Sequence, residues 1–78
     1  MPLVVEFTVE PFVEGAPGPH VQAALDVAEA SGLDVEFGPF GTVVSGGEDA
    51  QVLGTVDAVV RAAVEAGATR VAVQVTRQ

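Results

Sequence analysis

The sequence contains no cysteine, no lysine and no asparagine, and each absence excludes a class of function. Without cysteine, the chain has neither a disulfide nor a thiolate metal site, which excludes a soft-metal carrier built on a Cys-x-x-Cys pair. Without asparagine, and with no arginine in the first loop (residues 11–19), it lacks the residues of an acylphosphatase-like phosphate site. The remaining residues favour binding or assembly over these chemistries.

Positive charge is also scarce. Eleven acidic residues face three arginines, which gives a net charge of −8 with the single histidine neutral. Nucleic-acid binding needs a cationic surface that displaces counterions from phosphates, so this chain is not expected to bind nucleic acid. A small cationic or neutral ligand suits the negative field, although an acidic surface also simply keeps a protein soluble.

Long apolar runs are missing as well. No run approaches the length of a membrane span, and the first residues lack the basic start of a signal peptide, so we expect a cytoplasmic protein with no membrane partner. Residues 1–78 suffice for one domain. Because 49% of so short a chain is hydrophobic, self-association into a homodimer or homotetramer is a natural way to bury the excess.

The apolar residues that are present follow strand and helix periods in turn. Strands are predicted over residues 3–10, 33–37, 42–45 and 69–76, and helices over residues 20–31 and 48–66. Pro19 suits the start of the first helix, and Gly32 and Gly67 suit the ends of the two helices. The order β-α-β-β-α-β predicts an α+β, ferredoxin-like sandwich: a four-stranded antiparallel sheet with two helices on one face.

Alternation along the strands assigns side chains to the two faces of the sheet. A turn over residues 38–41 pairs Phe37 with Thr42 and Val35 with Val44, which directs these residues to the core. The other predicted core positions on strands are Leu3, Val5, Phe7, Val9, Leu33, Val71, Val73 and Val75. On the helices they are the apolar stripes Val21, Ala24, Leu25 and Ala28, and Val52, Val56, Val59, Val60 and Ala63, the second widened by Leu53 and Val64. The uncovered face carries Val4, Glu6, Thr8, Glu36, Val43, Ser45, Ala72, Gln74 and Thr76. Since its first strand offers no outward aromatic residue, this face does not suit an RNA-recognition domain.

No catalytic constellation is visible. His20 has no cysteine to activate, and its place at a helix start suits a surface or packing role as well as a ligand contact. Ser31 and Ser45 sit at predicted helix ends, and Ser45 with Glu48 has the spacing of a capping box. We therefore expect a protein that is not an enzyme and needs no metal or cofactor.

The chain centres on the hairpin Glu36-Phe-Gly-Pro-Phe-Gly-Thr-Val-Val-Ser45. Together with the preceding Ser31-Gly-Leu-Asp-Val, it resembles the small thiamine-binding-protein family in the pattern Ser-Gly-Leu-x-x-Glu-Phe-Gly-Pro-x-Gly-Thr, and the likeness extends over nearly the whole chain. The resemblance implies a ferredoxin-like fold, dimers or tetramers, and binding of thiamine or its aminopyrimidine moiety. The chain departs from the family at Ser45, where glutamate is common.

Thiamine is a permanent cation with a flat aminopyrimidine, so an acceptor, an aromatic wall and a negative field would all serve its recognition. Glu36, with Glu6 beside it, is the candidate acceptor. The candidate walls are Phe37 and Phe40, and the candidate polar contacts are Thr42, Thr8 and Ser45. Each has a structural alternative, such as core packing for Phe37, an oligomer contact for Phe40, solvation for the two glutamates and strand propensity for Thr42. The alternative function is an assembly or regulatory domain that self-associates through its open sheet face and has no native small ligand.

Overall fold

The computed structural model of the chain describes residues 2–11, 18–38 and 41–78. All six predicted elements are present, with ends that differ from the predicted ones by at most one residue. They are β1 (Leu3–Glu10), α1 (Pro19–Ala30), β2 (Asp34–Gly38), β3 (Gly41–Ser45), α2 (Asp49–Glu65) and β4 (Arg70–Arg77).

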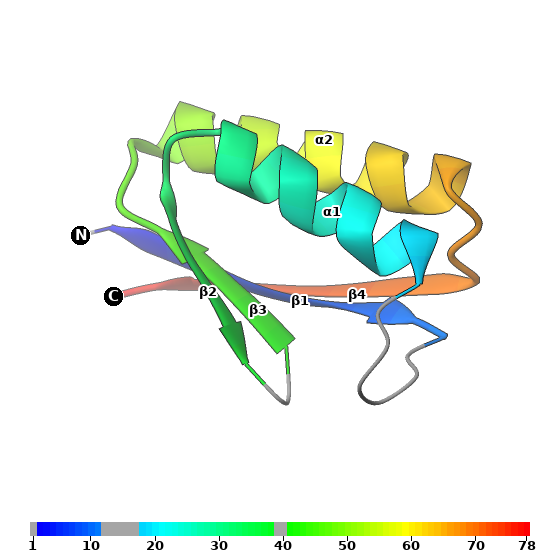
Figure 1. Cartoon of the computed structure of the whole chain (residues 1–78). Coiled ribbons are helices and arrows are strands. Elements are labelled where there is room, and N and C mark those ends of the chain that lie inside the picture. Colours follow the sequence, from blue (N-terminus) through cyan, green and yellow to red (C-terminus); the bar gives the residue numbers. More distant parts are fainter. Residues whose placement is uncertain (1, 12–17, 39–40) are drawn as a thin grey trace.

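The four strands form one antiparallel sheet in the order β2-β3-β1-β4. Both helices lie on the same side of this sheet and leave its other side bare (Figure 1). This arrangement is the ferredoxin-like α+β fold, as the order of elements predicted. The predicted hairpin register is also confirmed, because Phe37 pairs with Thr42 and Val35 with Val44.

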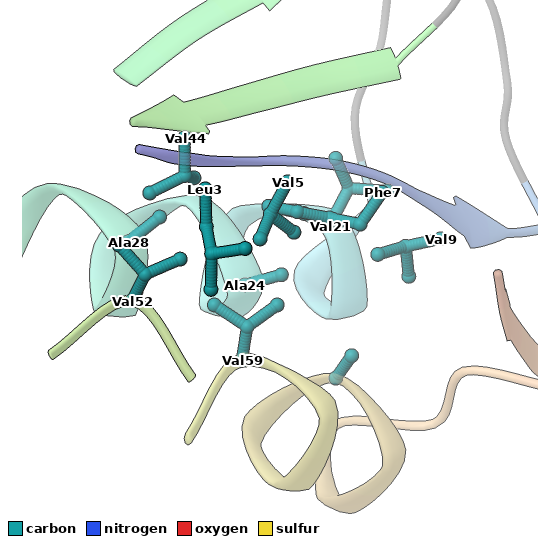
Figure 2. Packing of buried hydrophobic residues seen from close by; sticks show 11 residues of the cluster. Leu3, Val5, Phe7, Val9, Val21, Ala24, Ala28, Val44, Val52 and Val59 are labelled. Carbon is teal, nitrogen blue, oxygen red and sulfur yellow. The ribbon is translucent and has the colours of Figure 1, made fainter. Parts of the chain in front are cut away.

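The core lies between the sheet and the helices. All four alternate apolar residues of β1 are buried and meet small or branched residues of α1 and α2 (Figure 2). The largest fully buried side chains are Val5, Val44, Val52 and Val59. Burying a valine of this kind contributes about 1.5–3 kcal/mol, so these contacts hold the two layers together.

Burial was predicted wrongly at the margins of the core. Phe37, Val73 and Val75 share the helix-facing side of the sheet with buried partners, yet all three are exposed. They belong to β2 and β4, the two edge strands of the sheet. The two helices cover the central strands more fully than these edge strands. Leu53 and Val64, which were expected to widen the buried stripe of α2, are also exposed.

The helix ends follow local chemistry, with one correction. Pro19 starts α1, and Gly32 follows its end with a φ of 79°, a conformation that favours glycine. The residue before α2 is Glu48, whose side chain makes no capping hydrogen bond, while Ser45 is the last residue of β3. The predicted capping box between Ser45 and Glu48 is therefore not formed.

Candidate functional site

A cavity of about 380 Å³ opens at the end of the sheet where the β2–β3 hairpin turns. Its size falls within the range of small-molecule sites. Every element except α2 contributes to its walls. We call it the hairpin-end cavity, and its lining residues are Phe7, Thr8, Val9, Glu10, Val21, Leu25, Phe37, Gly38, Gly41, Thr42, Arg70 and Ala72.

The cavity lies beside the last residues of β1. Strand β1 pairs with β4 along its whole length, up to Glu10, but its described pairing with β3 ends where Phe7 meets Thr42. Gly41 still lies against Thr8, since a Cβ at Gly41 would come within 3.3 Å of Thr8 Cγ2. Val21 and Leu25 of α1 contribute the helix-side wall of the cavity.

The backbone of Val9 points toward the β3 side of the sheet. Gln78 donates its backbone N–H to the Pro2 carbonyl over 2.9 Å, so the even-numbered residues of β1 bond with β4. Because bonding alternates along an antiparallel strand, the N–H and C=O of Val9 point the other way. In the register of β1 with β3, the position opposite Val9 lies outside the described residues. Val9 itself lines the cavity.

The hydroxyl of Thr42 is the side-chain group of the cavity wall that bears most directly on ligand binding. Thr42 is only 4% exposed, and no hydrogen bond joins its hydroxyl to another described residue. The oxygen itself keeps contact with the cavity, because no fully enclosed side-chain oxygen or nitrogen of the described residues lacks a partner. The other buried threonine, Thr55, donates its hydroxyl to the Gln51 carbonyl over 2.9 Å. A hydroxyl that is unpaired within the described residues and open to a cavity can donate to or accept from a ligand there.

Phe37 supplies an aromatic surface. Its side chain is 52% exposed, which is unusual for so large an apolar group beside a core. It lines the cavity from β2, next to Gly38 and across the hairpin from Thr42. An exposed ring beside a cavity is available to stack on a flat ligand.

The charged groups of the cavity form one pair. Arg70 Nε lies 3.5 Å from Glu10 Oε2, and both side chains are well exposed. A surface pair of this kind contributes little to stability, so Glu10 is free to exchange its cationic partner at small cost.

The structure divides the predicted site residues into groups. Thr8, Phe37 and Thr42 line the hairpin-end cavity. Glu6 and Glu36 lie on the open face of the sheet, each paired with Val43 of the strand between them. Ser45 pairs with Asp34 at the other end of the hairpin. Phe40 lies outside the described residues.

Sequence reasoning missed the contributions of Val9 and Glu10 from the end of β1, Val21 and Leu25 from α1, and Arg70 and Ala72 from β4. Strand and helix periods assign each of these residues to an element, but they do not say which elements meet around a cavity.

His20 has a structural contact in this region. Its Nε2 hydrogen-bonds with the carbonyl oxygen of Pro11, which ties the start of α1 to the end of β1. Within residues 2–11, 18–38 and 41–78, no group of three or more acidic or histidine side chains is placed to hold a metal ion. Neither described helix has the length and apolar character needed to cross a membrane.

Known proteins resemble this chain at the level of family and of fold. The profile of the thiamine-binding protein family matches residues 5–77, which is nearly the entire chain. No curated protein matches the sequence.

Three solved structures share the fold. A domain of unknown function, DUF77, from Bacillus cereus is 26% identical with a TM-score of 0.75, and the match covers 100% of this chain and 77% of that one. A hypothetical protein from Methanocaldococcus jannascii is 23% identical with a TM-score of 0.70, over 99% and 81% of the two chains. A protein from Thermotoga maritima named for thiamine biosynthesis or salvage is 25% identical with a TM-score of 0.58, over 97% and 81%.

Proposed function

Because the chain belongs to the thiamine-binding protein family, we propose that it binds thiamine or a related aminopyrimidine in the hairpin-end cavity, without catalysing a reaction. The observation that carries this proposal is the free hydroxyl of buried Thr42 in the wall of a cavity of about 380 Å³. The thiamine-related name of the Thermotoga maritima structure is in keeping with it.

The groups around the cavity suit an aminopyrimidine. The amino group of such a ring donates a hydrogen bond and the neighbouring ring nitrogen accepts one. In the proposed complex the Thr42 hydroxyl donates to the ring nitrogen or accepts from the amino group. The exposed ring of Phe37 stacks on its flat face.

The charge of the protein suits the rest of thiamine. The thiazolium ring is a permanent cation, and the chain carries a net charge of −8. Glu10, at the rim of the cavity, is the carboxylate nearest to the proposed site. A cation attracted there would compete with Arg70, whose exposed pair with Glu10 contributes little free energy. Binding should therefore weaken as salt screens the field.

Glu36 remains the alternative acceptor, with Glu6 beside it. Both carboxylates lie on the open face of the sheet, away from Thr42 and Phe37, so the two proposals make different predictions. A site on the open face depends on Glu36 and not on Thr42, whereas a site in the hairpin-end cavity depends on Thr42 and not on Glu36.

The test is an isothermal titration at low salt with thiamine, its pyrimidine fragment and an analogue with a keto group in place of the amino group. The proposal predicts binding of thiamine and of the fragment, and loss of binding for the keto analogue. Thr42→Val should weaken thiamine binding, while Thr55→Val, the same change at the other buried threonine, and Glu36→Gln should not. Absence of heat with all three ligands would overturn the proposed function.

The second candidate function is an assembly domain without a native small ligand. It is favoured by the exposed apolar residues of α2 and β4, which do not touch the hairpin-end cavity. The titration separates the two, because an assembly domain gives no heat with thiamine.

A further inference from the structure

The hairpin-end cavity has two unlike halves, one on each face of the sheet. Side chains alternate between the two faces along every strand, and directly paired residues share a face. The described lining residues on the helix side are Phe7, Val9, Val21, Leu25, Phe37 and Thr42. Those on the open face are Thr8, Glu10, Arg70 and Ala72. The cavity therefore reaches from the core side of the sheet to its open face, and a single ligand can extend over both.

The two halves differ in charge. On the helix side, the described lining residues include no charged side chain, and the polar group there is the Thr42 hydroxyl beside the ring of Phe37. On the open face two charges lie together, because Arg70 pairs directly with Glu10 across β1 and β4. A neutral flat ring suits the first half, and a charged group suits the second.

Arg70 is held more loosely than the other two arginines. Arg61 donates to Asp57 over 3.0 Å, and Arg77 donates to Asp49 over 2.9 Å. Arg70 Nε lies 3.5 Å from the Glu10 carboxylate, a length beyond an ordinary hydrogen bond, and its side chain is 74% exposed. The donors of the Arg70 guanidinium are therefore available to a ligand in the open-face half of the cavity.

A thiazolium ring alone would satisfy only one of the two charged groups. A cation beside Glu10 also lies close to Arg70, and like charges repel. A phosphate ester on the same ligand reverses this, because it carries a charge of about −1.5 to −2 at neutral pH and its oxygens match the donors of a guanidinium. Each charge then has an opposite neighbour: the thiazolium lies by Glu10 and the phosphate by Arg70.

We propose that the hairpin-end cavity prefers the phosphate monoester of its ligand, thiamine monophosphate over thiamine, and that Arg70 is the residue that binds the phosphate. This inference rests on the proposed function, since it places the aminopyrimidine by Thr42 and the thiazolium by Glu10. The net charge of −8 disfavours a phosphate elsewhere on the molecule. The preference should therefore depend on Arg70 alone.

Isothermal titration at low salt, in a buffer without phosphate, compares thiamine with thiamine monophosphate. The wild type should bind the monophosphate about tenfold more tightly, as expected for one exposed charge-assisted contact. Arg70→Gln should abolish this preference without weakening the binding of thiamine. Arg61→Gln is the matched control, because it removes the same charge from an exposed arginine of α2 that does not line the cavity, and it should keep the preference.

Phosphorus NMR of the bound monophosphate gives a second readout. Its resonance should shift on binding to the wild type and to Arg61→Gln, and much less on binding to Arg70→Gln. Equal or tighter binding of thiamine by the wild type, or a preference that survives in Arg70→Gln or is lost in Arg61→Gln, would overturn this inference and leave the proposed function standing. Absence of binding by both ligands would overturn the proposed function and this inference with it.

Discussion

Replacing Thr42 with valine should make the ligand-free protein more stable and the ligand complex weaker. Valine has nearly the shape of threonine but lacks the hydroxyl. In the structure Thr42 is 4% exposed, no hydrogen bond joins its hydroxyl to another described residue, and the oxygen keeps contact with the cavity. A polar group without a protein partner lowers the free energy of unfolding when no ligand is bound, and strengthens binding when a ligand pairs with it. Its removal therefore raises stability and lowers affinity.

The magnitudes follow from general values. An unpaired buried hydroxyl costs about 1–3 kcal/mol, and the lower end applies here because the cavity gives the group some contact with water. Thr42→Val should therefore raise the free energy of unfolding by about 1 kcal/mol, which corresponds to a melting temperature higher by about 4–8 °C in a domain of this size. Loss of one hydrogen bond to the ligand, worth about 0.5–1.5 kcal/mol, weakens binding about 2- to 12-fold.

Urea denaturation of Thr42→Val and Thr55→Val, each without ligand, measures the first effect. The Thr55 hydroxyl donates to Gln51, so its removal deletes a hydrogen bond and should lower the free energy of unfolding by about 0.5–1.5 kcal/mol. The same chemical change thus has opposite effects at the two positions. If Thr42→Val destabilised the ligand-free protein as Thr55→Val does, the Thr42 hydroxyl would have a partner in the folded chain, and the reasoning would be refuted.

Other predictions concern glycine, charge and the ligand. Gly54 is an exposed residue of α2 with no atom near an added methyl group, so Gly54→Ala should stabilise the protein by up to about 1 kcal/mol. Gly32 has a φ of 79°, so Gly32→Ala should destabilise the protein by about 1 kcal/mol. Urea denaturation measures both effects. The hydrogen bond from Arg77, aided by its charge, lowers the pKa of Asp49, so the stability that this pair adds is present at neutral pH and is lost as the pH falls through that lowered pKa. The difference in melting temperature between wild type and Asp49→Asn should accordingly vanish in strong acid, and a constant difference would exclude this linkage. Saturating thiamine should raise the melting temperature of the wild type, and Phe37→Ala should reduce that rise.

The fold was predictable because local and long-range signals agree. Period-2 alternation, helical stripes and Gly32 and Gly67 at helix ends all lead to one order of elements, and this order allows few topologies. The register of the hairpin followed from the turn between Phe37 and Thr42.

Burial at the edges was not predictable. Phe37, Val73 and Val75 have core-like patterns, but whether a helix covers an edge strand depends on the spatial fit of two layers, which periodicity does not contain. The sequence pattern is correct about the face of each residue and wrong about its exposure.

The candidate site was predicted in part for a similar reason. Strand alternation placed Glu36 and Thr42 on opposite faces, yet a hairpin motif alone does not say which face a ligand uses. The walls of the cavity come from five elements, which span the chain from β1 to β4. Tertiary structure was needed to bring Thr8 and Thr42 together with Val9 and Leu25.

The most direct test of the central claim is an NMR titration of the ¹⁵N-labelled protein with thiamine. Binding in the hairpin-end cavity predicts that the largest amide shifts cluster at Val9, Leu25, Phe37 and Thr42. Shifts centred on Val43 and its neighbours on the open sheet face, or no shifts at saturating thiamine, would contradict the account.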